Sequence, residues 1–529
     1  MADNSNSPHY FLPQWISADA RTLEADICVY GGTAAGVIAA ATAADRGKRV
    51  VLLQPGSHWG GMTTGGLGFT DYGDKRVIGG RAHRFYAELG SLHGREVEWS
   101  FEPSAATTVL TGYLDHANIQ SLRFQYLQHA EVAEGRIRSL RLLGGLRVKA
   151  AMFIDATYEG DLLALAGVSY TAGREPNSLY GETINGVQVR EKHQFSTRVD
   201  PYVVPGDPGS GTLPGVNEFD AAPDGSGDGK LQAYNFRVCM TDDPKLRIAW
   251  AKPAGYDPGQ YELARRWFHS EKDPFNEPLR PDSHIARKFD VLTQRTADGY
   301  HKTDTNNHGA VSSDFIGANY AWPEISYADR ERMFQAHVQY QQGLYYFFAN
   351  DPGMPERYRE AYAQWGLAGD EFTDTGHWPH QLYIREARRM VSDYVLTEHD
   401  TQHHRQVDDA VGKGSYTMDS HNCQRVVRYI DGEPWTLNEG DVQLRPKAAY
   451  AISYRSIVPR KGECENLLVP VCLAASHIAF GSIRMEPVFM VLAESAAIAA
   501  TLALDNRCAV QALPYEDLRP EVAAAGQVV

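Results

Sequence analysis

This sequence of 529 residues lacks the marks of several protein classes. Its six cysteines form no CxxC pair and no Cys/His spacing typical of zinc ligands, so we expect buried thiols and no metal site. The net charge of −15 comes without a basic block, which argues against nucleic-acid binding because phosphate neutralisation needs clustered Lys and Arg. No run of about 18 apolar residues predicts a bilayer span, so no membrane partner is expected.

The N-terminus, MADNSNSPHYFLPQWI, also lacks the basic and apolar stretches of an export signal, so we expect a cytoplasmic location. The chain is longer than the roughly 250 to 300 residues at which a single core stops growing. At least two domains, or one elaborated domain, are therefore expected. Such a chain can bury a large cofactor.

What the sequence does contain begins with a pattern of strand, turn and helix. Residues 26–30 predict an apolar strand, residues 31–36 a glycine-rich turn, residues 37–46 an alanine-rich helix and residues 49–53 a second strand. This βαβ unit indicates an α/β fold with a Rossmann-like nucleotide-binding domain. Further strands are predicted at residues 136–143, 146–154 and 466–472, and a closing helix at 487–504.

The turn, GGTAAG, carries two of the three glycines of a dinucleotide fingerprint. Gly31 and Gly36 stand where a tight turn and close helix packing need glycine, but Thr33 occupies the middle position. The helix N-terminus would still offer N–H groups to a diphosphate, and the Thr33 hydroxyl would be a further donor. Gln54 stands where an acid commonly receives ribose hydroxyls, and a carboxamide can accept one such bond. The turn alone leaves NAD, FAD and the absence of a ligand open.

Composition changes along the chain and sets the expected domains. Residues 200–230 are rich in Gly, Pro and Asp, which is typical of a loop. Residues 231–415 are rich in Tyr, Trp, His and Arg, and a largely helical region is expected there. The expected domains are an N-terminal extension (1–23), a discontinuous nucleotide-binding domain (24–190 and 416–510), an inserted substrate or cap domain (191–415) and a C-terminal tail (511–529).

Two further segments favour a flat, anionic ligand. The segment SHWGGMTTGGLGFTDYG places five glycines between Ser57 and Gly68, as expected where backbone approaches a planar group. Pro487 suits the first turn of the closing helix, so the amides around residues 485–488 would be free to face an anion.

Together these motifs resemble a known family. The patterns GGTxAG, HxGGMxxGGLGxTD, FIDATYEGDLxALAG, TDDP, DEFTD, WPHQLYxREARRM, SYxMDSH and ASHxAxGSIRMEPVFM are similar to those of bacterial FAD-dependent oxidoreductases related to fumarate reductase and succinate dehydrogenase flavoproteins. The resemblance covers roughly residues 26–504 and implies a glutathione-reductase-like FAD-binding domain.

The resemblance also implies a set of cofactor contacts. The turn would hold the FAD diphosphate, residue 54 would face the adenosine ribose, the Gly60–Gly68 loop would pass near the flavin, the strand end at Asp155 would flank the adenine side, and the helix after Arg484 would point at the pyrimidine edge. The implied FAD-binding residues are Gly31, Gly32, Thr33, Ala34, Gly36, Gln54, Pro55, His58, Gly60, Gly61, Met62, Gly65, Gly66, Asp155, Ala156, Thr157, Arg484, Met485 and Glu486.

His58 raises the question of a covalent bond to the cofactor. Its relation to the glycine loop resembles fumarate-reductase-type enzymes, in which a histidine in this neighbourhood bonds the flavin. The spacing from the second strand is shorter here. We expect non-covalent FAD, with a covalent link through His58 as the alternative.

A flavoenzyme also needs a base for the substrate proton, and histidine is the usual choice near neutral pH. His477 ranks first because its loop must pass the flavin. His421 follows Asp419 by two positions, which would place both side chains on one face of a strand. His380 precedes a predicted helix and is the third candidate. A purely structural role stays open for each.

Two arginines are candidates for binding charge. Arg385 would lie on the helix predicted after His380, sharing a face with neighbouring arginines, and would clamp a substrate carboxylate or pair with Glu386 and Asp393. Arg484 would stabilise the negative charge of reduced flavin. A structural ion pair between Arg484 and Glu486 or another acid is the alternative.

The sequence contains one dinucleotide turn and no second GxGxxG, so electrons are expected to enter from substrate rather than from a bound NAD(P)H. The predicted function is an oxidase or dehydrogenase that takes hydride from a C–H next to O or N of a small polar, possibly sugar-derived molecule. The alternatives are a flavin monooxygenase, a double-bond reductase fed by an external donor, and a non-catalytic flavoprotein. The electron acceptor, O₂ or another carrier, and the oligomeric state stay open.

Overall fold

The computed structural model describes residues 7–270, 289–296 and 298–529. One sheet organises the nucleotide-binding part, with strands in the order β3-β2-β1-β6-β5-β4 and β21 beside β6. Its strands are β1 (Thr22–Tyr30), β2 (Val50–Leu53), β3 (Ile119–Leu122), β4 (Leu127–Ala133), β5 (Arg136–Leu142), β6 (Arg147–Asp155) and β21 (Leu467–Leu468). The half formed by β3, β2, β1, β6 and β21 is parallel, and β5 and β4 extend it antiparallel. The α/β, Rossmann-like prediction is confirmed to this extent.

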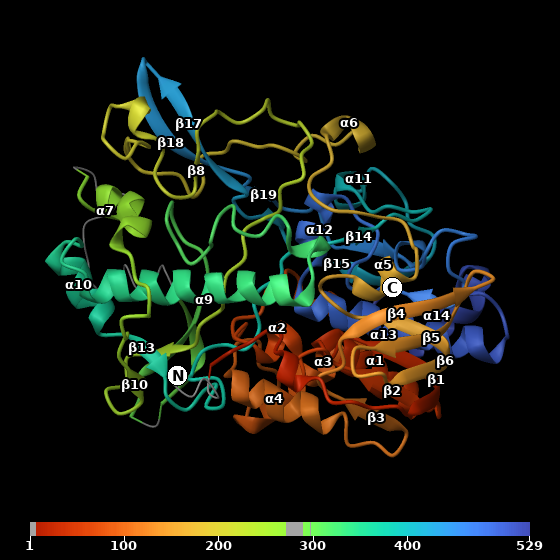
Figure 1. Ribbon diagram of the computed structural model, residues 1–529. Helices are drawn as coiled ribbons and strands as arrows, with labels where there is room; N and C mark the ends of the chain where they lie inside the picture. The colour runs from red at the N-terminus through yellow and green to blue at the C-terminus, as the bar shows by residue number, and fades with distance from the viewer. Residues whose placement is uncertain (1–6, 271–288, 297) are drawn as a thin grey trace.

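Two apolar helices pack together beside this sheet. Helix α1 (Ala34–Asp45) and helix α13 (Glu486–Asp505) are lined with alanines, and almost every residue of both is buried. By length and composition alone α13 would fit a membrane span, with a hydropathy of 1.8, but 89% of that window is buried inside the protein. Here α13 is a core helix, and small side chains let it lie close to α1 (Figure 1).

Shorter helices complete this part of the molecule. They are α2 (Gly61–Thr64), α3 (Gly80–Leu92), α4 (Pro103–Gly112), α5 (Asp161–Leu165), α12 (His477–Ile483) and α14 (Tyr515–Ala524). Residues 511–529, predicted as a tail, include α14 and pack onto the core: the Gly80 N–H donates to the Gly526 carbonyl at 3.0 Å, and the Gln527 amide contacts Glu494. The C-terminal segment is therefore part of the folded body.

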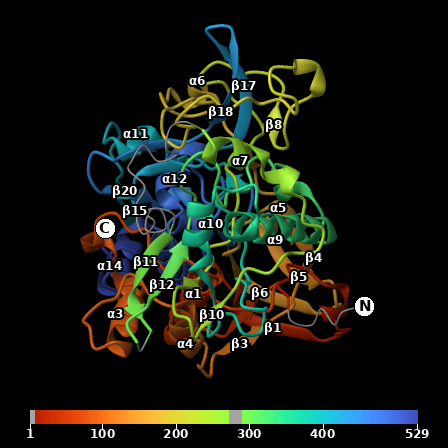
Figure 2. The same ribbon diagram turned by 90° about the vertical axis from the view of Figure 1, so that its left-hand side faces the viewer.

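The middle of the chain is not largely helical, so that prediction is not confirmed. It contains a five-stranded antiparallel sheet, in the order β10-β13-β9-β12-β11, together with the long helix α9 (Figures 1 and 2). Its elements are β8 (Val216–Asn217), β9 (Met240–Thr241), β10 (Arg247–Ile248), α7 (Glu262–Phe268), β11 (Phe289–Arg295), β12 (His301–Thr305), α9 (Tyr327–Asn350), α10 (Glu356–Ala363), β13 (Gly366–Ala368), β14 (Arg389–Met390), α11 (Glu398–Thr401) and β15 (Ala410–Gly414). Residues 271–288 and 297 of this region lie outside the described residues.

The remaining elements connect these parts. They are β7 (Tyr170–Thr171), α6 (Asn177–Tyr180), β16 (Met418–Ser420), β17 (Gln424–Ile430), β18 (Glu433–Glu439), β19 (Val442–Leu444) and β20 (Tyr450–Ser453). The hairpin β17–β18 pairs with β8 and projects as a lobe at the top of Figure 1. The pairing of β8 with β17 joins segments from the two sides of residue 416. The domain boundary expected at that residue stays a prediction.

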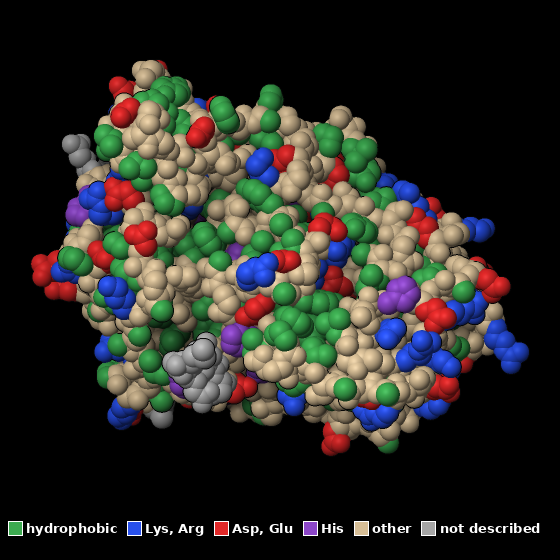
Figure 3. Space-filling view, in the orientation of Figure 1, with side chains coloured by type: hydrophobic (Ala, Val, Ile, Leu, Met, Phe, Trp, Pro, Cys, Tyr) green, Lys and Arg blue, Asp and Glu red, His purple; other side chains and the backbone are tan. Residues whose placement is uncertain are grey.

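The surface and the thiols complete the picture. On the face in Figure 3, Lys and Arg lie interspersed with Asp and Glu and do not gather into one basic patch. All six cysteines are free, and five of them are buried, while Cys508 is half-buried.

Candidate functional site

The glycine-rich turn joins the end of β1 to α1. A Cβ added at Gly31, which has φ +103°, would lie 2.7 Å from backbone atoms of Ala156 and Thr157, and one at Gly36 would lie 1.8 Å from the Gly31 carbonyl oxygen. Both positions therefore require glycine. The Thr33 hydroxyl donates to the Ala156 carbonyl at 2.7 Å and accepts from the Gly36 N–H at 3.2 Å, which caps α1. The middle position thus ties the turn to β6, and its hydroxyl is not a free donor.

Gln54, at the end of β2, also serves the turn. Its carboxamide oxygen accepts the Gly32 N–H at 2.7 Å. This contact helps to fix the turn, Gln54 also lines the cleft described below, and its contact with a ribose stays a prediction. Asp155, at the end of β6, is buried and accepts from the Thr157 N–H and hydroxyl and from the Leu163 N–H. Burial raises the pKa of Asp155 to about 6, and its bonds hold the strand end and α5 together.

A solvent-open cleft lies at these strand ends. It is lined by His9, Tyr10, Gly31, Thr33, Gln54, Pro55, Gly56, Ser57, His58, Thr157, Tyr158, Glu159, Phe334, His380 and Gln381. The first turn of α1 opens at this edge, so its N–H groups and the positive end of its dipole suit an anionic diphosphate. The nucleotide half of FAD fits these residues.

His58 and His380 lie together on the wall of this cleft. Their rings stack 3.9 Å apart at 9°. His58 contacts the Ser57 hydroxyl at 2.7 Å and the Asp374 carboxylate at 2.8 Å. Burial and the neighbouring His58 lower the pKa of His380 well below its usual value, and its Nε2 has no hydrogen-bond partner among the described residues. Non-covalent FAD stays the prediction, with a covalent link through His58 as the alternative.

The glycine loop is packed against protein. A Cβ at Gly61, with φ +55°, would lie 2.3 Å from the Tyr158 hydroxyl, and one at Gly66, with φ +121°, would lie 1.8 Å from the Arg237 carbonyl oxygen. The clustering of glycine is thus required by close approach of other chain segments. Gly60, Gly65 and Met62 belong to the same loop, and its contact with a flavin stays a prediction.

The start of α13 carries a buried acid, and among the described residues no side chain caps its backbone N–H groups, so their contact with an anion stays a prediction. Glu486 accepts from the Tyr158 hydroxyl at 2.6 Å and from the Thr63 hydroxyl at 2.8 Å, and burial raises its pKa to about 7. Arg484 does not pair with it. The Arg484 guanidinium contacts Asp419 at 3.0 Å and the Tyr383 hydroxyl at 2.9 Å, so the other acid of the structural alternative is Asp419.

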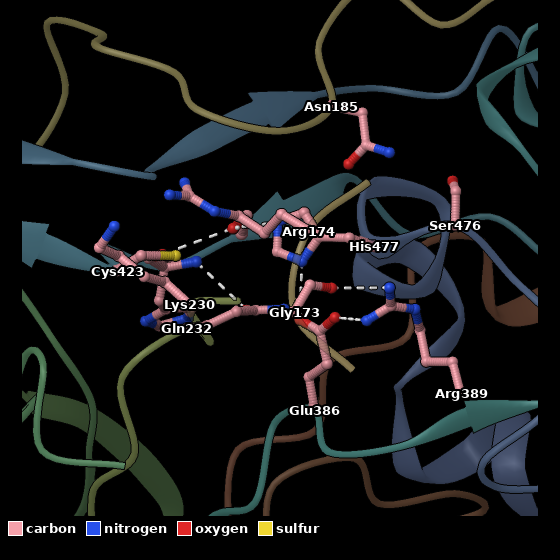
Figure 4. A network of polar contacts seen from close by, with 12 residues as sticks. Gly173, Arg174, Asn185, Lys230, Gln232, Glu386, Arg389, Cys423, Ser476 and His477 are labelled. Atoms are coloured by element: carbon pink, nitrogen blue, oxygen red, sulfur yellow. Dashed lines mark hydrogen bonds and ion pairs between the residues drawn. The ribbon is translucent and has the colours of Figure 1, made fainter. Parts of the chain in front are cut away.

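His477, the first-ranked base, lies in a closed polar network (Figure 4). It is 2% exposed and is the first residue of α12. Its Nδ1 lies 2.7 Å from Glu386 and its Nε2 lies 3.2 Å from the Ser420 hydroxyl. Burial, with Arg389 and Arg174 nearby, lowers the pKa of His477 to about 3. The ring is therefore neutral near neutral pH, with Nδ1–H donating to the carboxylate.

His421 lies in a different setting. Its Nδ1 is 2.8 Å from Asp314 and its Nε2 is 3.3 Å from Asp419, so the predicted proximity of His421 and Asp419 is confirmed. The ring borders a second, polar cavity of about 310 Å³. This polar cavity is lined by Phe69, Asp71, Lys192, His193, Asn306, Asn307, His308, Tyr416, Thr417, Asp419, His421 and Gln443. No local pattern indicated Asp314, because it lies 107 positions away from His421 in the chain.

The helix predicted after His380 is absent, since residues 381–388 are irregular and β14 follows. Arg385 contacts Asp314 at 2.9 Å and lies 4.6 Å from the centre of the Tyr383 ring. Arg388 turns elsewhere, to Asp161. The shared helical face is therefore wrong, and the clamp on a substrate carboxylate stays a prediction. The irregular backbone sends each guanidinium to a separate carboxylate.

Three guanidiniums surround Tyr383. Those of Arg237, Arg385 and Arg484 lie 6.0, 4.6 and 5.7 Å from the ring centre. Each contacts its own carboxylate, Arg237 with Asp304, Arg385 with Asp314 and Arg484 with Asp419. Burial opposes ionisation of Asp314, but Arg385 and His421 hold the pKa of Asp314 below its usual value. The positive and negative charges beside the polar cavity are thus matched.

Comparisons with known proteins give the family. No curated protein matches the chain. Similar solved structures include L-proline dehydrogenase from P. horikoshii (16% identity, 30% of this chain and 59% of that one, TM-score 0.25), Mycobacterium smegmatis Sdh1 (13%, 30% and 42%, 0.22) and NikD, an unusual amino acid oxidase (13%, 29% and 56%, 0.23). The chain thus spans 42 to 59% of the length of these proteins. The family described as FAD dependent oxidoreductase matches residues 26–522, and the protein belongs to that family of FAD-binding enzymes.

Proposed function

We propose that the protein is an FAD-dependent oxidase or dehydrogenase that removes hydride from a C–H next to O or N of a small polar substrate bound in the polar cavity. The observation that carries this proposal is the course of one loop. Ser57 and His58 line the nucleotide cleft, while Phe69 and Asp71, farther along the same loop, line the polar cavity beside His421. A single segment therefore runs from the nucleotide cleft to the polar cavity that His421 borders.

The residues of the polar cavity divide the chemistry between them. FAD, when bound, accepts the two electrons of the oxidation. His421 takes the proton from the substrate O–H or N–H. Since Nδ1–H donates to Asp314, Nε2 is the basic nitrogen, and Asp419 next to it stabilises the positive ring that forms. The substrate would thus lose one hydride to the bound FAD and one proton to His421.

The lining of the cavity supports a hydroxyl-rich substrate. The amides of Asn306, Asn307 and Gln443 can each donate and accept hydrogen bonds, and Phe69 and Tyr416 offer aromatic faces. This combination suits a sugar-derived polyol, whose hydroxyls need polar partners while its C–H faces pack on rings.

Arg484 positions the base in this mechanism. Its guanidinium holds both the carboxylate and the backbone carbonyl of Asp419, each at 3.0 Å. Because that carboxylate is fixed, the environment of His421 Nε2 is fixed with it. Arg484 thus acts through Asp419.

Anaerobic mixing tests the proposal. The FAD-loaded protein is mixed, without oxygen, with a panel of sugars, polyols, hydroxy acids and amines. The absorbance of the flavin near 450 nm is then followed, because reduction of the flavin bleaches it. We expect bleaching by at least one substrate class with no other donor present. Bleaching by NAD(P)H or another external donor alone would instead support a monooxygenase or double-bond reductase.

A further inference from the structure

The segment of residues 8–12, set aside as part of an N-terminal extension, lies against the nucleotide cleft. His9 and Tyr10 line it together with Gly31, Thr33 and Gln54. We call residues 8–12 the N-terminal strap. A domain boundary at residue 23 would exclude from the cofactor domain a segment that forms one wall of its cleft.

The carboxylate of Glu331 makes three of the contacts between the strap and α9. Glu331 accepts the backbone N–H groups of Tyr10 at 2.7 Å and Phe11 at 2.9 Å, and lies 2.7 Å from His9 Nδ1. The neighbouring Gln335 donates to the Pro8 carbonyl at 2.8 Å. These bonds satisfy consecutive polar groups of a segment that belongs to no sheet, so Glu331 is the latch that orders it.

The strap also contacts the nucleotide-binding part. Tyr126, just before β4, donates its hydroxyl to the Tyr10 carbonyl at 2.5 Å. The Tyr10 hydroxyl donates to Glu159, which follows β6, at 3.3 Å and accepts from Arg330 of α9 at 3.2 Å. The Tyr10 ring packs edge-on against Trp322, with 5.0 Å between centres. The strap therefore bridges the sheet and α9 across the cleft.

We propose that the N-terminal strap is part of the FAD site, closing the cleft over the nucleotide half of the cofactor, and that the Glu331 latch controls cofactor release. The cleft that His9 and Tyr10 border is the one into which the first turn of α1 opens. A ligand held there would contact the strap, so a displaced strap would hold it less firmly. Loosening the latch should accelerate release, and it should change association less.

The direct test compares Glu331→Ala with Arg332→Ala. Arg332 is the next residue of α9, its side chain is 74% exposed, and it pairs with Asp329, away from the strap. FAD is titrated into each apoprotein, and release is timed after dilution into a flavin scavenger. For Glu331→Ala we expect about a tenfold higher dissociation constant, carried by faster release and equivalent to about 1.4 kcal/mol. Wild-type affinity in Glu331→Ala, with an unchanged melting temperature of the apoprotein, would overturn the proposal.

A second measurement needs no variant. Because ligand binding and segment ordering are coupled reciprocally, FAD should slow amide hydrogen exchange at residues 10–12 of the wild-type protein. The exposed segment at residues 206–209 is the internal reference, and its exchange should stay unchanged. Equal exchange of the strap with and without FAD would refute the proposal even if Glu331→Ala failed to fold. Neither result depends on the identity of the substrate.

Discussion

Two buried histidines, each beside a carboxylate, give this protein two different kinds of site. His421 lies between Asp314 and Asp419 and borders the polar cavity. His477 lies between Glu386 and Ser420 and is enclosed by Arg389 and its partners. The partners are similar, but only one ring borders a space that a substrate can enter. Access to a cavity, rather than the presence of a carboxylate, separates a catalytic candidate from a structural histidine.

The largest effect should follow from replacing the ring at the polar cavity. His421→Asn removes the proposed base but keeps a polar side chain, so substrate reduction of the flavin should slow by about 10²- to 10⁴-fold. Anaerobic stopped-flow absorbance measures this rate. His404→Asn, at an exposed histidine, is the matched control. A rate for His421→Asn within a few-fold of wild type would place the base elsewhere.

Breaking the enclosed network should instead cost stability. Glu386→Ala removes the carboxylate that Arg389 and His477 share in the core, and the free energy of unfolding should fall by about 3 to 5 kcal/mol. Urea unfolding followed by tryptophan fluorescence measures it. Glu324→Ala, which removes a carboxylate paired with Arg388 but 56% exposed, should cost about 1 kcal/mol or less. Equal losses of unfolding free energy in the two variants would mean that the enclosed network contributes no more to stability than an exposed ion pair.

The pH dependence of stability should distinguish the enclosed ring further. Folding lowers the pKa of His477 from an ordinary 6.5 to about 3, so between these values the unfolded chain binds the proton and the folded protein does not. The contribution of neutral His477 is therefore complete above pH 6.5 and is lost as the pH falls, by about 2 kcal/mol at pH 5. His477→Gln should unfold with a shallower acid dependence than wild type between pH 6.5 and pH 4. Parallel curves would show that the ring is already protonated in the fold.

The smallest effect should come from the bond that joins the two sites. Ser420 contacts His477 at 3.2 Å and immediately precedes His421 in the chain. Ser420→Ala should lower the free energy of unfolding by about 1 kcal/mol and change the rate of flavin reduction by less than about threefold. Measuring both in one preparation tests whether the sites act separately. A loss of rate as large as that of His421→Asn would join them into one catalytic unit.

The same contrast explains what the sequence could predict. The βαβ unit and α13 are predictable because short-range patterns determine them: short apolar runs, a glycine turn and an alanine-rich helix. The role of residues 381–388 was not predicted, because periodic arginines suggested a helix while carboxylates distant in the chain, such as Asp314 and Asp161, fix an irregular backbone. The sequence motif alone favours His477 as the catalytic base. Its burial depends on contacts with Glu386 and Arg389, and no local sequence pattern predicts these contacts.

The cysteines have a practical consequence. Burial raises the pKa of the Cys28, Cys239 and Cys472 thiols well above the usual value, whereas Cys508 keeps part of its surface in solvent. Because thiolate is the reactive form, a disulfide reagent should modify the native chain at one position beside the end of α13. The other thiols should react only as the core opens. The native protein thus offers a single attachment point for a dye. The rate at which its remaining thiols react then reports the rate of unfolding.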